Sequence, residues 1–154
     1  MSATVRPMTE AEYQRWLPGA KAGYADDMVR SGVDAETAHA KAEHDFPALL
    51  PDGIVSEGHL LYTVEDDGDA VGVLWLAERE GDLGRSLFVY DVQIDESQRG
   101  RGLGKETMRF AEEEARRRGL SFVSLNVFGG NDVARNLYRS LGYEETAVYM
   151  MKRV

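Results

Sequence analysis

The stretch QRGRGLGK, residues 98–105, alternates three glycines with two arginines and a leucine, and ends in a lysine. It lies between SLFVYDVQI (86–94), which is typical of a strand, and a segment with helical periodicity. The first turn of a helix has unpaired backbone N–H groups and is partly positive, and glycines let an anion approach them closely. We therefore expect a phosphate-binding turn here, with Arg99, Arg101 and Lys105 adding positive charge around it.

The stretch does not match the two best-known phosphate-binding motifs. A Walker loop requires G-x-x-x-x-G-K-[ST], but Arg99 stands at its first glycine and Glu106 at its Ser/Thr position. The dinucleotide fingerprint requires G-x-G-x-x-G, whereas the glycines here are spaced G-x-G-x-G. Taken alone, the stretch also fits a glycine-rich turn that carries surface arginines and binds nothing.

The rest of the chain predicts a single α/β (α+β) domain over residues 1–154, with helices flanking a central, mostly antiparallel mixed sheet. The predicted order is β-α-α-β-β-β-α-β-α-β. In chain order we expect a strand 4–8, helices 9–31 and 34–50, strands 59–65, 70–78 and 86–94, a helix 102–118, a strand 121–128, a helix 131–142 and a final strand 143–154.

Local signals support several of these boundaries. Thr9 and Glu12 form a capping-box pattern, and Asp34 is a suitable cap for the second helix. Pro18 lies inside the first helical pattern, where we expect a kink. The residues DDGD (66–69), between two predicted strands, are typical of a hairpin turn. Alternation along 86–94 predicts two faces, one with Phe88, Tyr90, Val92 and Ile94 and the other with Val89, Asp91 and Gln93.

The composition of the chain excludes several classes of function. The 154 residues include no cysteine, which excludes disulfides and thiolate chemistry, and the three histidines show no metal-ligand spacing. The net charge of −9 disfavours nucleic acid and anionic membranes and favours a cationic partner such as an amine, although solubility alone also explains it. Neither a signal peptide nor a membrane span is recognisable, so we expect a cytoplasmic protein without a metal.

Two motifs resemble the GNAT superfamily of acyl-CoA-dependent N-acetyltransferases. RGRGLG (99–104) matches its R-x-x-G-x-G signature, and NDVARNLYRSLGY (131–143) matches its N-x-x-A-x-x-L-Y-x-x-x-G-[FY] segment. The resemblance implies acetyl-CoA (coenzyme A) as co-substrate, with its pyrophosphate on the glycine turn and its pantetheine arm along the strand that ends at Ile94. The cofactor-binding residues that it implies are Val92, Gln93, Ile94, Arg99, Gly100, Arg101, Gly102, Leu103, Gly104, Lys105, Asn131, Ala134, Arg135, Asn136 and Tyr138.

The resemblance also implies catalytic roles for two residues. Tyr138 is the candidate general acid for the leaving thiolate, because a phenol stays protonated at neutral pH; a core aromatic on an amphipathic helix is the alternative. Asp91 is the second candidate, as a base, an anchor for a cationic acceptor or a structural group, and Tyr90 is similarly ambiguous. The Val92 N–H is the candidate donor to the oxyanion.

The expected function is direct acetyl transfer to a primary amine on a small molecule, a peptide or a protein lysine. The alternative is a non-catalytic acyl-CoA-binding or sensor module, and a weaker one is an acidic scaffold. A homodimer is a family-level expectation. We expect His59 to be a solvated edge histidine, while Tyr24, Phe46 and Leu50 either shape the acceptor cleft or pack in the core.

Overall fold

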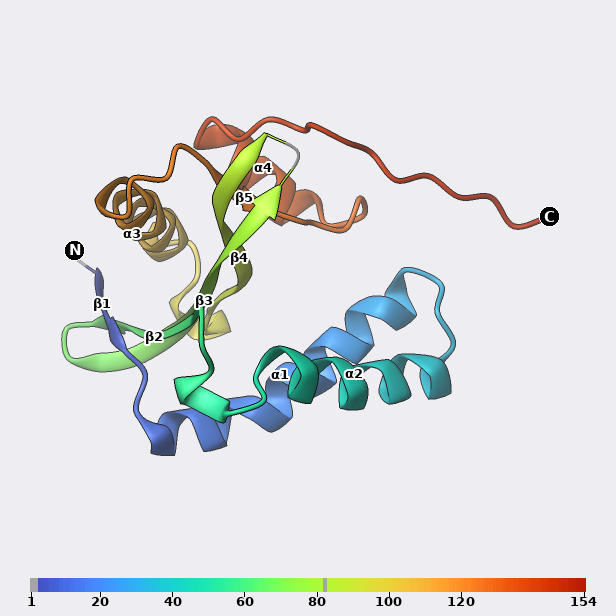
Figure 1. The fold of residues 1–154 in the computed structure, drawn as a ribbon, viewed down its shortest axis with the longest axis horizontal. Helices are drawn as coiled ribbons and strands as arrows, with labels where there is room; N and C mark the ends of the chain where they lie inside the picture. The colour runs from blue at the N-terminus through green and yellow to red at the C-terminus, as the bar shows by residue number, and fades with distance from the viewer. Residues whose placement is uncertain (1–2, 82) are drawn as a thin grey trace.

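The computed structural model describes residues 3–81 and 83–154, and in it a five-stranded sheet lies between two pairs of helices (Figure 1). The strands β1 to β5 follow chain order across the sheet; the first four are antiparallel neighbours, and β5 runs parallel to β4. The elements are β1 Ala3–Pro7, α1 Glu10–Arg30, α2 Ala35–Leu49, β2 His59–Asp66, β3 Asp69–Gly81, β4 Gly84–Ile94, α3 Leu103–Arg117, β5 Val123–Leu125 and α4 Asp132–Ser140, with short 3-10 turns at Gly53–Val55 and Glu96–Gln98. The predicted fold class is confirmed.

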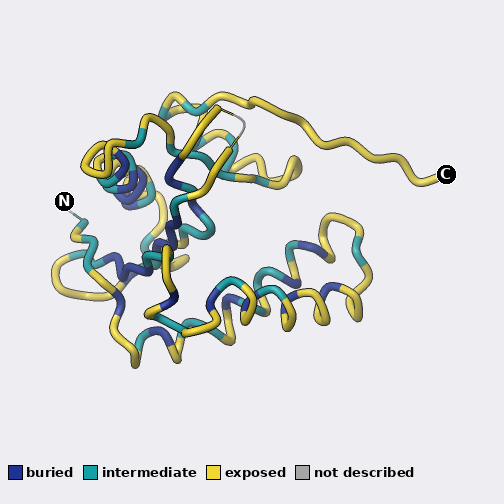
Figure 2. The backbone as a smooth tube through the Cα atoms, viewed as in Figure 1, coloured by how far each residue is buried: buried dark blue, intermediate teal, exposed yellow. Residues whose placement is uncertain are grey.

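Each face of the sheet has its own core. Leu74, Leu87 and Val89 pack on the α3 face against the inner side of α3, which includes the fully buried Met108 and Ala111. On the other face α1 and α2 cover a core that is largely aromatic. Figure 2 shows the buried positions in dark blue along the sheet and on the inner sides of α1, α2 and α3. Because side chains alternate along a strand, one sheet supplies both cores.

The predicted helix starts are confirmed. Thr9 and Glu12 form the capping box at the start of α1, and the Asp34 carboxylate accepts from the Thr37 N–H at the start of α2. Helix α1 continues through Pro18 to Arg30. Between β2 and β3, residues 66–69 form the expected hairpin turn, with positive φ at both Asp67 and Gly68.

A β-bulge in β4 overturns the predicted alternation of its faces. Trp75 of β3 pairs with Asp91 whereas Leu76 pairs with Val89, so Tyr90 is an extra residue on β4. Tyr90 packs on the α1 face, but Val92 packs with Val89 on the α3 face. The prediction that Tyr90 and Val92 share a face is therefore wrong, because an inserted residue shifts the alternation beyond it.

Two predicted strands differ from the structure. Residues 121–128 form a strand only at Val123–Leu125. Residues 143–154, expected as the last strand, form none, since no other strand of the described chain lies beside them. This segment instead extends away from the domain to the C-terminus, and from Glu144 onward it is exposed throughout (Figures 1 and 2).

Candidate active site

The glycine stretch forms a turn that leads into an uncapped helix. Gly100 and Gly102 have φ values of 80° and 81°, a conformation that side chains with a Cβ rarely adopt. Gly102 is the N-cap of α3, and no side chain caps the helix there. The first intrahelical bond runs from the Glu106 N–H to the Gly102 carbonyl, so the amides just before Glu106 remain available to an anion.

The three cations of the turn are arranged differently from one another. Arg99 donates from Nε to the Ile94 carbonyl, at 3.0 Å, and braces the end of β4. Arg101 is paired with Asp66 of the β2–β3 hairpin, at 2.9 Å. Lys105 is exposed in the first turn of α3. The folded hairpin thus brings Arg101 to a carboxylate, which balances its charge.

Strands β4 and β5 part next to this turn. Their pairing covers only Leu87 to Val89 on β4, while β4 itself continues to Ile94. Beyond Val89, the side of β4 that faced β5 has no strand beside it within the described residues. Val92, Gln93 and Ile94 lie on this unpaired part of the strand, which offers main-chain groups for an extended ligand to pair with.

Helix α4 brings the second motif to the start of α3. A Cβ added at Gly104 would lie 3.5 Å from Leu137 Cδ2, so the two motifs are in contact. Asn131 caps α4, with its Oδ1 accepting from the Ala134 N–H at 3.2 Å. Arg135 donates to the Gly129 carbonyl and pairs with Glu145. In the folded chain, the side chains of Asn131 and Arg135 therefore both bond to other groups of the protein.

Asn136 is exposed on α4. Tyr138 is half-buried on the same helix, packs on the α3-face core and meets Tyr143 edge-to-face at 5.9 Å. Burial raises the pKa of Tyr138, and the negative charge of Asp91 raises it further. The phenol is therefore protonated at neutral pH and lies close enough to sense the charge of Asp91.

Asp91 is a largely buried carboxyl at the bulge of β4. Burial raises its pKa to about 6, and the charge of Asp27 on α1 adds to this. The Gln93 side chain, the Val92 amide and the Trp16 indole oppose the shift by stabilising the carboxylate. The Val92 N–H, the expected oxyanion donor, is thus also a neighbour of the Asp91 carboxylate.

Sequence reasoning missed the α1 residues beside Asp91. Trp16 Nε1 is buried and has no hydrogen-bond partner in the part of the chain that the structure describes. A buried indole N–H normally finds a partner, so this donor is suited to a ligand or to the carboxylate. Trp16 and Asp27 lie more than sixty residues before Asp91 in the sequence, so no local pattern indicated that they would be its neighbours.

Beside Asp91 in the sheet, aromatic rings from β2, β3 and β4 pack against one another. The Trp75 ring stacks on the Tyr90 ring, with their centroids 4.7 Å apart, and the centroid of the His59 ring lies 5.5 Å from that of Tyr90. Trp75 Nε1 donates to His59 Nδ1 at 3.0 Å, and burial lowers the pKa of His59. His59 is thus a half-buried neutral ring whose Nδ1 is occupied, rather than the expected solvated histidine. Phe46 and Leu50 are buried in the same core, which favours packing as their role.

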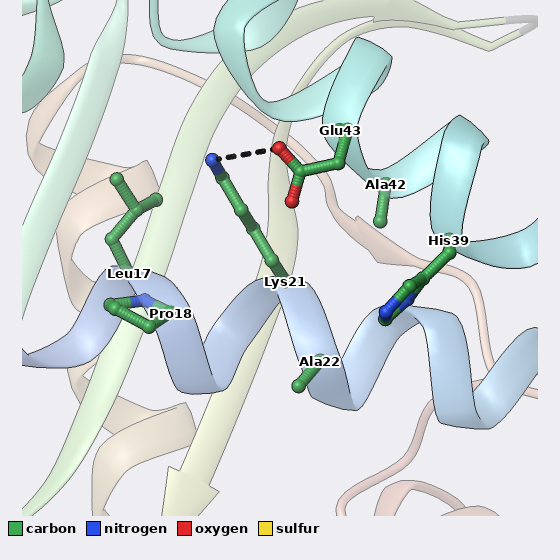
Figure 3. A pocket seen from close by; sticks show the side chains of 7 residues that line it. All are labelled: Leu17, Pro18, Lys21, Ala22, His39, Ala42 and Glu43. Carbon is green, nitrogen blue, oxygen red and sulfur yellow. Dashed lines mark ion pairs between the residues drawn. The ribbon is translucent and has the colours of Figure 1, made fainter.

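Two hollows adjoin α1. One, of about 300 Å³, lies between α1 and the sheet and is lined by Trp16 and Gln93, the neighbours of Asp91, and by Glu12 and Asp95. The other, of about 260 Å³, lies between α1 and α2 (Figure 3). Lys21 and Glu43 form an ion pair of 3.6 Å across it, and its lining comes from these two helices alone. The first hollow is lined by residues of the sheet and by neighbours of Asp91, whereas no described residue of the sheet lines the second.

Residues 3–81 and 83–154 contain no helix with the length and apolar character needed to cross a membrane. They also contain no group of three or more His, Asp or Glu side chains placed to hold a metal ion.

The family model of the GNAT acetyltransferases matches residues 26–143, and the chain belongs to this family. It is 31% identical over 156 residues to YycN of Bacillus subtilis, described as an uncharacterized N-acetyltransferase, with all of both chains covered. The protein is accordingly an enzyme of the acyltransferase class.

Solved structures agree with this assignment. The crystal structure of Bacillus subtilis YycN superposes with a TM-score of 0.91 and 32% identity, covering 99% of each chain. AAC(6')-Iy, solved in complex with the bisubstrate analogue CoA-S-monomethyl-acetylneamine, has a TM-score of 0.65 and 18% identity, covering 100% of this chain and 99% of its own. At that identity the second likeness shows the fold alone.

Proposed function

We propose that this protein transfers an acetyl group from acetyl-CoA directly to a primary amine. The observation that carries the proposal is that Tyr138 lies close enough to Asp91 to sense its charge, where β4 parts from β5 and α3 begins without a cap. The coenzyme A complex of a protein with this fold supports the choice of donor.

The binding site follows from the unpaired backbone groups. Of the expected amides from Arg99 to Lys105, the Arg99 N–H already donates to the Glu96 carbonyl, at 3.3 Å. The amides from Gly100 to Lys105 hold the pyrophosphate, because they lie at the uncapped, positive end of α3. The pantetheine amides pair with the main chain of Val92 to Ile94. The thioester is then delivered to the opening between β4 and β5, next to Tyr138.

The acceptor approaches from the α1 side. Asp91 and Asp27 make this region negative, and the hollow beside Trp16 and Gln93 leads to it. Asp91 attracts the ammonium form and takes one of its protons, directly or through water, which a pKa of about 6 allows at neutral pH. Such help is needed because only about one in a thousand amines of pKa about 10.4 is neutral near pH 7.

The acyl transfer then balances as follows. The neutral amine attacks the thioester carbonyl, the C–N bond forms, and the Val92 N–H donates to the oxyanion. The nitrogen loses its second proton to solvent, the C–S bond breaks, and the Tyr138 hydroxyl gives its proton to the departing sulfur. Its raised pKa keeps that proton in place until the thiolate forms, and solvent restores it afterwards.

The test is release of free coenzyme A thiol from acetyl-CoA with a panel of mono- and polyamines, peptides and lysine-bearing proteins. Tyr138→Phe should lower kcat at least about tenfold while changing the KM for acetyl-CoA less than about threefold. Gly102→Ala should instead weaken coenzyme A binding, because an alanine at a φ of 81° strains the turn. Coenzyme binding without thiol release for any amine would indicate a binding module instead.

A further inference from the structure

The indole N–H of Trp16 is a buried donor that the folded chain does not use. The Trp16 ring packs against the rings of Tyr13, Phe46 and Trp75, at centroid distances of 5.6–6.3 Å, which fixes its position in α1. Among the residues that the structure describes, no atom accepts a hydrogen bond from its Nε1. Because a buried indole N–H normally has a partner, an oxygen atom of a bound molecule is a suitable acceptor.

This donor lies beside the carboxyl to which the acceptor amine is assigned. Burial raises the pKa of Asp91, and the Trp16 indole N–H partly offsets this by stabilising the carboxylate. The N–H is therefore close to the carboxylate, although it makes no hydrogen bond to it. In an α-amino amide, the carbonyl oxygen lies about 3 Å from the amine nitrogen. The amine can thus contact Asp91 while the carbonyl accepts from Trp16.

We propose that the acceptor is an α-aminoacyl amide, such as the first residue of a peptide, and that Trp16 selects it by donating from Nε1 to its first carbonyl oxygen. The inference rests on the proposed function, since it requires the amine at Asp91. It narrows the acceptor from primary amines in general to those with a neighbouring carbonyl. The products are the Nα-acetylated amide and free coenzyme A, through the steps given above.

The hollow beside Trp16 has room for the rest of such an acceptor. Its volume of about 300 Å³ is at the lower end of the range of about 300–1,000 Å³ for small-molecule sites, which suits one or two residues of an extended peptide. Its described charged lining residues are Glu12, Arg15 and Asp95. With Asp91 nearby, carboxylates outnumber the arginine, and this favours a neutral amide over the free carboxylate of an amino acid.

The proton transfer also favours an α-amine over a lysine side chain. The α-amino group of a peptide has a pKa of about 7.7–8.0, whereas a lysine amine has a pKa of about 10.4. Asp91 has a pKa of about 6, so the equilibrium for taking the proton is unfavourable by about 10² for the α-amine and by about 10⁴ for the lysine amine. The carboxyl is therefore matched to the less basic amine.

The first test compares two acceptors in the wild type and in Trp16→Phe, by release of free coenzyme A thiol. Alaninamide and 3-methylbutan-2-amine have nearly the same shape, but only alaninamide has a carbonyl. The variant should lower kcat/KM at least about fivefold for alaninamide, whose carbonyl loses its donor, and less than about twofold for the alkylamine. Comparing wild type with variant for each amine separately cancels the difference in basicity between the two amines.

Trp75→Phe is the matched control. It removes an indole from the same aromatic core, but the Trp75 N–H already donates to His59, at 3.0 Å. The control should therefore change kcat/KM by the same factor for both amines. An equal loss for both amines in Trp16→Phe, or no loss for alaninamide, would overturn the inference and leave the acetyl transfer intact. No thiol release from any amine would instead refute the proposed function, and the inference with it.

The second test uses the wild type alone, so it does not depend on the folding of a variant. The peptide Ala-Lys-Ala has an α-amine beside a carbonyl and a side-chain amine without one. Mass spectrometry of the product locates the acetyl group, after subtraction of the enzyme-free reaction. The α-amine should be acetylated at least about tenfold faster than the side-chain amine. Acetylation mainly on the lysine side chain would overturn the inference while supporting the transferase activity.

Discussion

Asp91→Asn removes a carboxylate that the fold holds largely away from water between α1 and β4. Burial raises its pKa from the ordinary 3.8 to about 6, a shift of about 2 units. One unit corresponds to 1.36 kcal/mol, so holding the charged form in the folded protein costs about 3 kcal/mol. The asparagine carries no charge, and we expect it to recover part of that free energy of unfolding at neutral pH.

The sign of the pH dependence follows from the raised pKa. Below about pH 3, Asp91 is protonated in both the folded and the unfolded chain, so burying it carries no charge penalty. Between about pH 3 and pH 6 the unfolded chain ionises first, so the wild type loses stability relative to the variant. Above about pH 7 both states are ionised and the difference stays constant. The free energy of unfolding of the variant minus that of the wild type should thus rise by about 2–3 kcal/mol and then level off.

The assay is urea-induced unfolding of both proteins from pH 4.5 to 8, with Asp26→Asn as a matched control. Asp26 is exposed on the same helix, α1, and its substitution should change stability by less than about 0.5 kcal/mol at every pH. The same Asp91 variant should lose at least about tenfold in kcat if the carboxylate takes the amine proton. A stability difference that is equal at all pH values, or that shrinks as the pH rises, would refute the assigned burial and charge of Asp91.

Three further substitutions test the scaffold. Gly72→Ala should destabilise the protein by more than about 2 kcal/mol and weaken coenzyme A binding, because its Cβ would lie 2.3 Å from the Gln93 carbonyl oxygen; urea unfolding and calorimetric titration check both effects. Gly23→Ala, in α1 with open space around the new Cβ, should instead stabilise by about 0.5–1 kcal/mol in the same unfolding assay. Glu12→Gln should cost about 1–3 kcal/mol at pH 7 in that assay, because the Arg6 guanidinium holds the pKa of Glu12 well below its usual range. As the pH falls below about 4.5, the wild type should lose this advantage, and an equal loss in the variant would contradict the pairing.

Much of the fold could be predicted from short-range patterns. The capping box at Thr9, the cap at Asp34 and the hairpin at residues 66–69 each depend on neighbours within four positions, and all three are confirmed. The glycine turn was likewise predicted from its place between a strand and a helix, and Gly100 and Gly102 adopt the positive φ that such a turn requires.

The bulge at Tyr90 was not predictable in the same way. Alternation within 86–94 assumes one residue for each partner, and only the pairing with Trp75 and Leu76 of β3 reveals the extra one. The prediction of a final strand was wrong for a related reason, since a strand-like sequence forms a ladder only where another strand lies beside it. The roles proposed for Asp91 and Tyr138 remain predictions that the kinetic experiments above test.

By itself, the sequence determined the order of helices and strands as far as α4, the two family motifs and the glycine turn that leaves the start of α3 open. These depend on backbone preferences and side-chain periods that act over a few residues. The tertiary structure alone brought Trp16 and Asp27 to Asp91, paired Arg101 with Asp66 and separated β4 from β5 beyond Val89. Such contacts depend on how distant segments pack, because the burial and the charge that a side chain experiences are set by neighbours remote in the chain.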